Sequence, residues 1–225
     1  MLDVKNKKVA FIVCEVIYDE VKQNIPSNWK AVSLEKKLHE KSDDLRKKLQ
    51  NEIDSHQDYD VIILGYGLCG KGTEGLVSKN TYLVVSRCDD CIAMLLGSVA
   101  EYKKQHGMEP GTYYLTRGYI GDSEDFAVIN FSEVRHKYDD ETWEWVQKEL
   151  LKNYKRLVFI NTGNYDPGDF RKKAKEEAQK LGLRFEEVKG TDEFFKKMIS
   201  GRYDGDFLVL KPGEKVSTEM FMNLD

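Results

Sequence analysis

The sequence predicts an α/β fold of the Rossmann-like kind, a mostly parallel sheet with helices on both faces. Short runs rich in Val, Ile, Leu, Phe and Tyr alternate with segments of helical periodicity along the 225 residues, and this alternation is typical of βαβ units. In addition, every cysteine stands at or just past the end of one of these runs. The carboxyl ends of parallel strands are where open α/β sheets bind ligands.

The strands are short, β-branched and apolar, and helical patterns follow most of them. The segment 43–55 is predicted helical because Leu45, Leu49 and Ile53 recur at helical spacing on a charged surface. The other helices are expected at 89–105, 139–153, 167–181 and 191–200. Strands are expected at 8–14, 31–34, 61–66, 81–86, 112–116, 156–161, 184–188 and 206–210.

Domain organisation is predicted from a break in this pattern. Glycine and acidic residues interrupt the periodicity in 118–138. We therefore expect a cysteine-bearing α/β lobe over 1–130 and a smaller α/β lobe over 131–225, either separate from the first or continuous with it. The length allows both arrangements.

Composition excludes several classes of partner. With 35 basic and 39 acidic residues the net charge is −4, which argues against a nucleic-acid or anionic-membrane binder. No apolar run approaches the roughly 18 residues that span a bilayer, and the N-terminus has no signal-peptide pattern. Four cysteines with one Cys-x-x-Cys pair fit metal or redox use in a reducing compartment, so we expect a cytoplasmic protein.

The glycine-rich segment 65–72 follows an apolar run. Its residues match two nucleotide-binding motifs, but the sequence around it lacks features that each motif requires. It reads G-x-G-x-x-G, but a dinucleotide site needs a helix directly after the loop, and only ten residues precede the next strand. It also reads G-x-x-x-x-G-K, but Gly72 replaces the Ser or Thr of a phosphate loop. We interpret the segment as a turn whose backbone at Gly67 and Gly70 approaches a ligand closely and which presents Cys69.

The Cys88-x-x-Cys91 pair allows redox chemistry or metal binding. Two aspartates between the sulfurs raise the thiol pKa and disfavour a thioredoxin-like nucleophile, whereas a cation gains from carboxylates. Three ligands from three strand ends, completed by His39, water or substrate, form the pattern of a catalytic zinc site. An iron–sulfur cluster uses the same thiolates and stays an alternative. The predicted zinc ligands are Cys14, Cys69, Cys91 and His39, and Arg87 either orients an anionic substrate or pairs with Asp89 or Asp90.

Several motifs resemble one uncharacterised domain family of anaerobic archaea and bacteria, often encoded beside corrinoid-dependent methyltransferases. The motifs are CEV, a Leu-His pair, YGLCG, R-x-x-D-C-I-x-x-L-L-G-S, P-G-T-Y-Y-L-T and F-L-V-L-K-P-G. The resemblance covers nearly the whole chain and leaves Cys88 outside the pattern. Among the residues that it places in a functional site, we assign Arg87 and Asp90 as catalytic and Ser98 as cofactor-binding. The full set that the resemblance implies is Cys14, His39, Cys69, Arg87, Asp90, Cys91, Gly97 and Ser98.

The leading hypothesis is a zinc-thiolate protein of methyl-group metabolism. As an enzyme it would transfer a methyl or other small group to or from a thiol, with a small-molecule substrate or a corrinoid methyltransferase protein as partner. The alternatives are a non-catalytic accessory protein that binds a metal or a corrinoid, and an iron–sulfur or dithiol redox protein. The chain lacks the D-x-H-x-x-G signature of a corrinoid carrier.

Overall fold

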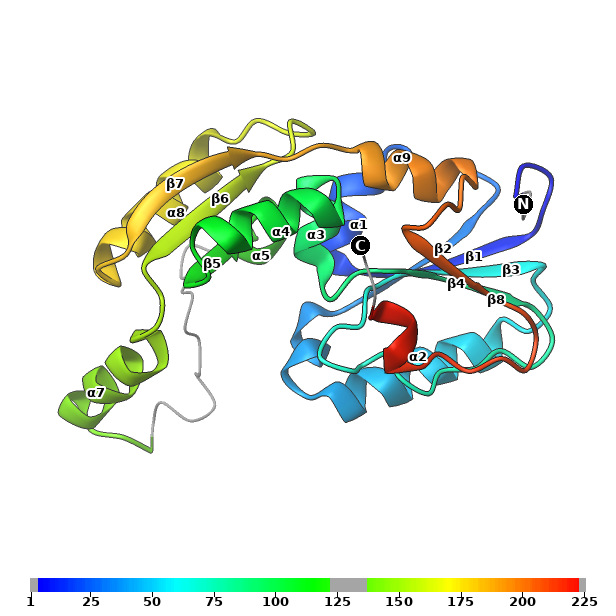
Figure 1. Ribbon diagram of the computed structural model, residues 1–225, viewed down its shortest axis with the longest axis horizontal. Coiled ribbons are helices and arrows are strands. Elements are labelled where there is room, and N and C mark those ends of the chain that lie inside the picture. The colour runs from blue at the N-terminus through cyan, green and yellow to red at the C-terminus, as the bar shows by residue number, and fades with distance from the viewer. Residues whose placement is uncertain (1–3, 122–136, 223–225) are drawn as a thin grey trace. The chain divides into compact units, whose positions relative to one another are not determined.

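The computed structural model describes residues 4–121 and 137–222, which fall into two compact units (Figure 1). Unit 1 consists of Met1–Tyr102 and Thr191–Asp225, and unit 2 of Lys103–Gly190. This division differs from the predicted one at residue 130, because the chain enters unit 2 earlier and then returns to unit 1. Most of the predicted break at 118–138 lies outside the described residues.

A five-stranded sheet forms the centre of unit 1, in the order β2-β1-β3-β4-β8. The first four strands are parallel and β8 runs antiparallel to β4, which confirms the mostly parallel sheet. The inner strands are buried on both faces and therefore carry continuous apolar runs. The bounds are β1 Val9–Cys14, β2 Lys30–Leu34, β3 Val61–Gly65, β4 Tyr82–Ser86 and β8 Phe207–Leu210.

This strand order creates a topological switch point between β1 and β3. From β1 the chain moves outward to β2, and it then crosses back to place β3 on the other side of β1. Connections that leave two adjacent strands in opposite directions open a crevice at their carboxyl ends, where ligands bind in folds of this kind. Val13 pairs with Gly65, so the ends of the two strands are level.

Helices cover both faces of this sheet, with α2 on one side and α1 and α9 on the other (Figure 1). The three apolar residues predicted for α2, Leu45, Leu49 and Ile53, are fully buried. The bounds are α1 Glu15–Val21, η1 Lys36–Glu40, α2 Ser42–Ser55, α3 Cys91–Leu96, α9 Glu193–Ser200 and η2 Thr218–Phe221. Helix α4, Val99–Met108, begins in unit 1 and ends in unit 2. The sequence analysis missed α1, which follows β1 without a loop.

The predicted helix 89–105 is two helices, broken at Gly97. This glycine ends α3 in the left-handed region, with φ 94°. A Cβ there would lie 2.5 Å from Oγ1 of Thr191, so no other residue fits without displacing its neighbour. Ser98 then begins α4 by accepting a hydrogen bond from the Glu101 amide at 3.1 Å.

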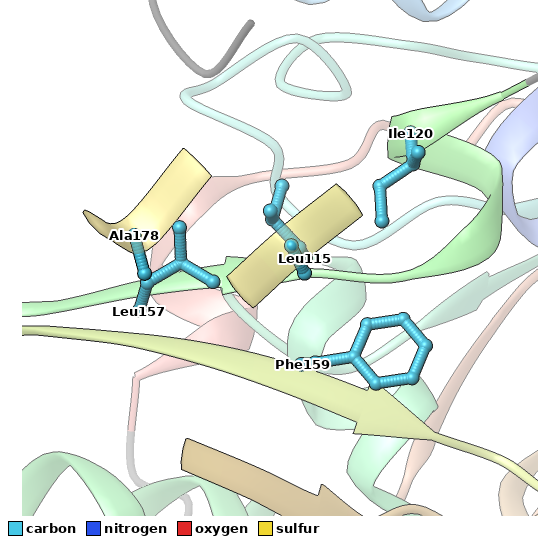
Figure 2. Packing of buried hydrophobic residues seen from close by; sticks show 6 residues of the cluster. Leu115, Ile120, Leu157, Phe159 and Ala178 are labelled. Atoms are coloured by element: carbon cyan, nitrogen blue, oxygen red, sulfur yellow. The ribbon is translucent and has the colours of Figure 1, made fainter. Parts of the chain in front are cut away.

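Unit 2 contains a parallel three-stranded sheet in the order β5-β6-β7. Helix α8 packs on β6 and β7, and apolar side chains of the sheet, α5 and α8 form one core cluster, part of which Figure 2 shows. The cluster comprises Leu115, Ile120, Leu157, Phe159, Ala174 and Ala178. The bounds are β5 Thr112–Leu115, α5 Arg117–Ile120, α7 Asp140–Leu151, β6 Arg156–Asn161, α8 Gly168–Lys180 and β7 Arg184–Lys189.

Each of the eight predicted strand segments matches a strand to within one residue at either end. Within the described ranges, no helix has the length and apolar character that crossing a membrane requires.

Candidate functional site

The carboxyl ends of β1, β3 and β4 lie side by side in unit 1, as the positions of the cysteines predicted. Cys14 is the last residue of β1, and Tyr66 directly follows β3. The Ser86 amide of β4 donates a hydrogen bond to the Tyr66 carbonyl at 3.2 Å, so the pairing of β3 with β4 continues past the end of β3. Residues far apart in the sequence therefore meet at one sheet edge.

Backbone pairing also brings the glycine loop beside the Cys-x-x-Cys segment. The Leu68 amide donates to the Cys88 carbonyl and the Cys69 amide to the Asp89 carbonyl, both at 2.8 Å. At Gly67, a Cβ would lie 2.4 Å from the Cys88 carbonyl oxygen and 2.9 Å from its Sγ. Gly67 is thus required by the close approach of the chain's own backbone, whereas Gly70 has open space around it.

The loop that carries Cys69 is held in an unusual conformation. Cys69, Gly70 and Lys71 are consecutive left-handed residues with φ 47°, 60° and 70°, a region costly for residues with a Cβ. Thr73 Oγ1 donates to the Gly67 carbonyl at 3.0 Å, and Arg46 of α2 donates to the Lys71 carbonyl at 2.8 Å. Strained backbone that is held in place is a pointer to a functional site.

No helix lies between β3 and β4, since residues 66–81 are described throughout and form turns and a single bridge. A dinucleotide or a phosphate loop needs a helix N-terminus directly after the glycines. The structure therefore agrees with the exclusion of both nucleotide motifs.

Tyr66 lies at the same sheet edge as Cys14, Cys69 and Cys91. Burial raises the pKa of this phenol most, and Cys14, Cys69 and Cys91 each raise the pKa further, in that order. The side chain is 1% exposed, and its hydroxyl finds no hydrogen-bond partner among the residues the structure describes. Cys14, Cys69 and Cys91, the predicted metal ligands, thus lie in the neighbourhood of a buried polar group.

His39 lies over this group from η1. Its ring stacks on the Tyr66 ring, with centroids 5.8 Å apart and an angle of 20° between the planes. Nδ1 contacts the Lys36 carbonyl at 3.1 Å. Although the residue is exposed as a whole, burial of its ring lowers the pKa of the imidazole, which favours the neutral form that binds metals.

No disulfide joins the four cysteines, and burial favours the protonated thiol at Cys14, Cys69 and Cys88. Burial raises the pKa of Cys14 to about 11 and that of Cys69 to about 12. Across 4–121 and 137–222, no three His, Cys, Asp or Glu side chains are grouped so that they could hold a metal ion. The site is therefore a set of cysteines at one sheet edge, not an assembled ligand set.

Cys88 differs from the other three cysteines. It is 0% exposed, it lies directly under Gly67, and burial raises its pKa well above the ordinary thiol value. A thiol this enclosed is a poor attacking nucleophile, so the position of Cys88 does not favour a thioredoxin-like pair.

Arg87 contacts the C-terminal segment of unit 1. Its Nε donates to the Met220 carbonyl at 2.7 Å and its Nη2 to the Met222 carbonyl at 3.3 Å. No ion pair joins Arg87 to Asp89 or Asp90 among the described contacts. The guanidinium thus fixes the chain around η2, and binding an anionic substrate would compete with these two carbonyls.

Asp90 and Ser98 both act at helix starts. Asp90 Oδ1 accepts a hydrogen bond from the Ile92 amide at 2.9 Å and caps α3, which places Cys91 in the first turn of that helix. Burial raises the pKa of the Asp90 carboxyl. Ser98 caps α4 after Gly97. Of the predicted residues, Cys14, Cys69, Asp90 and Cys91 therefore lie at this sheet edge, and His39 stacks on Tyr66 there.

The sequence analysis did not assign Tyr66 to the site. An aromatic residue at the end of an apolar strand is usually core, and periodicity cannot separate the two roles. The available signal was its place between Gly65 and Gly67, three residues before Cys69.

The chain was compared with known families, curated proteins and solved structures. A family described as "Protein of unknown function (DUF1638)" matches residues 33–199, a range that includes His39, Tyr66, Cys69 and Cys91 but not Cys14. No curated protein and no solved structure matches the chain.

Proposed function

The chain belongs to this family, and because the family description states no activity, we propose from the site itself that unit 1 binds a thiophilic metal ion, zinc in the first place. The ligands would be Cys14, Cys69 and Cys91. The observation that carries the proposal is that these three cysteines lie at or just past the ends of the adjacent parallel strands β1, β3 and β4, at the carboxyl edge that includes the switch point of the sheet. Thiolates are the ligands that zinc prefers in proteins.

Binding would require the three side chains to turn toward one ion and release their protons. The backbone positions support this step, because Cys14 ends β1, Cys69 lies in a loop fixed by Thr73 and Arg46, and Cys91 lies in the first turn of α3. A metal ion deprotonates the thiols that bind it. Three protein ligands leave a fourth position for His39, water or substrate, the pattern of a catalytic zinc.

The reaction class we propose is transfer of a methyl or other small group to or from a substrate thiol. A metal lowers the pKa of a thiol bound to it and so supplies the nucleophile at neutral pH. The proposed reaction class rests on the resemblance to proteins encoded beside corrinoid-dependent methyltransferases. The alternative, a non-catalytic accessory protein, predicts the same metal site without turnover. Because both proposals require the metal, metal content is the first measurement.

The test is elemental analysis of the anaerobically purified protein and of four single variants. We expect about one zinc per chain in the wild type, and loss of most of it in Cys14→Ala, Cys69→Ala and Cys91→Ala. Cys88→Ala is the matched control, because it removes a buried thiol from the same segment without removing a proposed ligand. It should keep its metal.

Two results would contradict the proposal. One is a wild-type protein with less than about half an equivalent of any metal. The other is equal metal loss in all four variants, which would indicate general unfolding of the edge. A brown protein rich in iron would instead support an iron–sulfur cluster on the same thiolates.

A further inference from the structure

Unit 1 contains a cavity of about 360 Å³ between helices α1 and α9. Both helices lie on the same face of the five-stranded sheet (Figure 1). The described residues that line the cavity include none of Cys14, Cys69 and Cys91, the cysteines of the thiol site. Small-molecule sites in proteins are cavities of about 300–1,000 Å³, so this one has room for a small ligand.

Helix α9 gives the cavity an apolar wall. Phe195 and Ile199 both line it, and residues four positions apart lie on the same face of a helix. Phe195 is 2% exposed and Ile199 is half-buried. A wall of this kind favours a ligand with a hydrocarbon part, because the ligand removes apolar surface from water when it binds.

Helix α1 contributes a buried carboxylate to the same cavity. Glu20 lines it and is 4% exposed. The residue lies in the last turn of α1, which contains no basic residue. Helix C-termini carry a partial negative charge, so the carboxylate and the helix end both favour a cation. Folding has already removed most of the water around this carboxylate, and less desolvation therefore remains when a cation binds.

The other charged residues of the lining leave this preference in place. Asp192 and Lys196 also line the cavity and form an ion pair at 2.9 Å. Lys196 forms a second pair with Glu193 at 3.2 Å. The positive charge in the lining is thus offset by carboxylates of its own helix, and with Glu20 the lining is negative. Its complement is a ligand with a positive charge.

We propose that this cavity is a binding site for a small ligand that combines a protonated amine with a hydrocarbon chain. The ammonium group faces Glu20, and the chain packs on Phe195 and Ile199. The site goes beyond the proposed function and is independent of it, since its lining contains no proposed metal ligand.

The test is a titration of ¹⁵N-labelled full-length protein with hexylamine, followed by two-dimensional NMR, which reports binding at each backbone amide. The matched neutral ligand is 1-hexanol, which has the same chain without the charge. We expect hexylamine to shift the amides of Glu20, Phe195 and Ile199 and to bind about tenfold more tightly than 1-hexanol, because hydrogen bonds to charged groups are the stronger ones.

Two variants assign the preference for the amine to Glu20. Glu20→Gln should bind hexylamine no more tightly than it binds 1-hexanol. Asp19→Asn is the matched control, because it removes the neighbouring carboxylate, which pairs with Lys22 at 2.6 Å and does not line the cavity. It should bind hexylamine as the wild type does.

Three results would overturn the proposal. The first is equal affinity of the wild type for hexylamine and 1-hexanol, a comparison that needs no variant and decides the question even if Glu20→Gln does not fold. The second is binding without shifts in α1 and α9. The third is equal loss of hexylamine affinity in Glu20→Gln and Asp19→Asn, which would indicate attraction by the general surface charge.

Discussion

At the scale of single residues, the thiol site depends on two glycines that allow strands and loops to approach closely. A Cβ at Gly65 would lie 2.6 Å from Val13 Cγ2, across the β1–β3 pair. A Cβ at Gly67 would meet the Cys88 carbonyl at 2.4 Å. The first contact is with a β-branched side chain in a buried strand, which has little freedom to move, and the second is with backbone. The close approach of these segments is therefore allowed by two residues without chemistry of their own.

Gly67→Ala should therefore disturb the site without touching a thiol. The added methyl group must push the loop away from Cys88, and overpacking of this kind costs about 1–3 kcal/mol. We expect a lower free energy of unfolding in urea and weaker metal binding, because Cys69 moves with the loop. Gly205→Ala in the same unit has open space and no left-handed φ, so it should change neither quantity. Wild-type metal affinity in Gly67→Ala would show that the loop position does not matter.

At the scale of single residues, some features of the site could be predicted from the sequence and others could not. The positions of Cys14, Cys69 and Cys91 at strand ends were enough to predict their shared edge, because parallel strands align their carboxyl ends. The role of Arg87 was not predictable, since its two acceptors are carbonyls of Met220 and Met222, more than 130 residues later in the chain. No local pattern encodes such a contact.

At the scale of elements, charged groups join the strands and helix of unit 2. Glu187 of β7 accepts from Arg171 of α8 at 2.6 and 2.8 Å and from Asn161 of β6 at 2.9 Å. Hydrogen bonds from Arg171 are the largest cause that lowers the pKa of Glu187. One carboxylate thus connects three elements, on a side chain that is 29% exposed.

This connection should make the stability of unit 2 depend on pH in the acidic range. A carboxyl group with a lowered folded-state pKa stabilises the fold above its unfolded pKa, about 4.3 for Glu, and loses that contribution as the pH falls through the folded value. The free-energy difference between wild type and Glu187→Gln should therefore shrink as the pH is lowered from 6 to 3. Its size at pH 6 should stay near that of a surface pair, at most about 1 kcal/mol.

The measurement is urea unfolding across this pH range, followed by a signal from unit 2. The double variant Arg171→Gln/Glu187→Gln is the control, because a cycle of the two changes isolates their interaction. A coupling free energy that does not change with pH would contradict the assignment.

The strands and helices that could be predicted are those that leave a periodic pattern in their own stretch of sequence. All eight strand segments and helix α2 follow from β-branched runs and the spacing of Leu45, Leu49 and Ile53. The break at Gly97 was not predicted, because it results from the approach of Thr191, which lies in another part of the sequence. Helix α1 was missed because an apolar segment that follows a strand without turn residues continues the same pattern.

At the scale of the whole molecule, the two units differ in the number of chain segments that form them. Unit 2 is one segment, Lys103–Gly190, whereas unit 1 is built from both ends of the chain. The pairing of β8 with β4 closes unit 1, and hydrophobic periodicity does not specify which strands pair. For this reason the sequence analysis placed a single boundary, where the chain in fact crosses twice.

All the proposed site residues lie in unit 1, so this unit should bind metal without unit 2. The chain leaves unit 1 after Tyr102 and returns at Thr191, and Thr191 contacts Gly97, five residues before the exit. Five helical residues span about 8 Å, which a flexible linker of about six residues covers. We expect a protein with 103–190 replaced by such a linker to unfold cooperatively and to bind the same metal equivalent as the full chain.

The isolated segment 103–190 is the matched control for this shortened protein. It has its own sheet and core cluster and no cysteine, so it should fold and bind no metal. The measurements are thermal unfolding by circular dichroism and elemental analysis of each fragment. A folded linker protein without metal, beside a full chain that holds it, would mean that residues of 103–190 complete the site, and the assignment of all ligands to unit 1 would then be wrong.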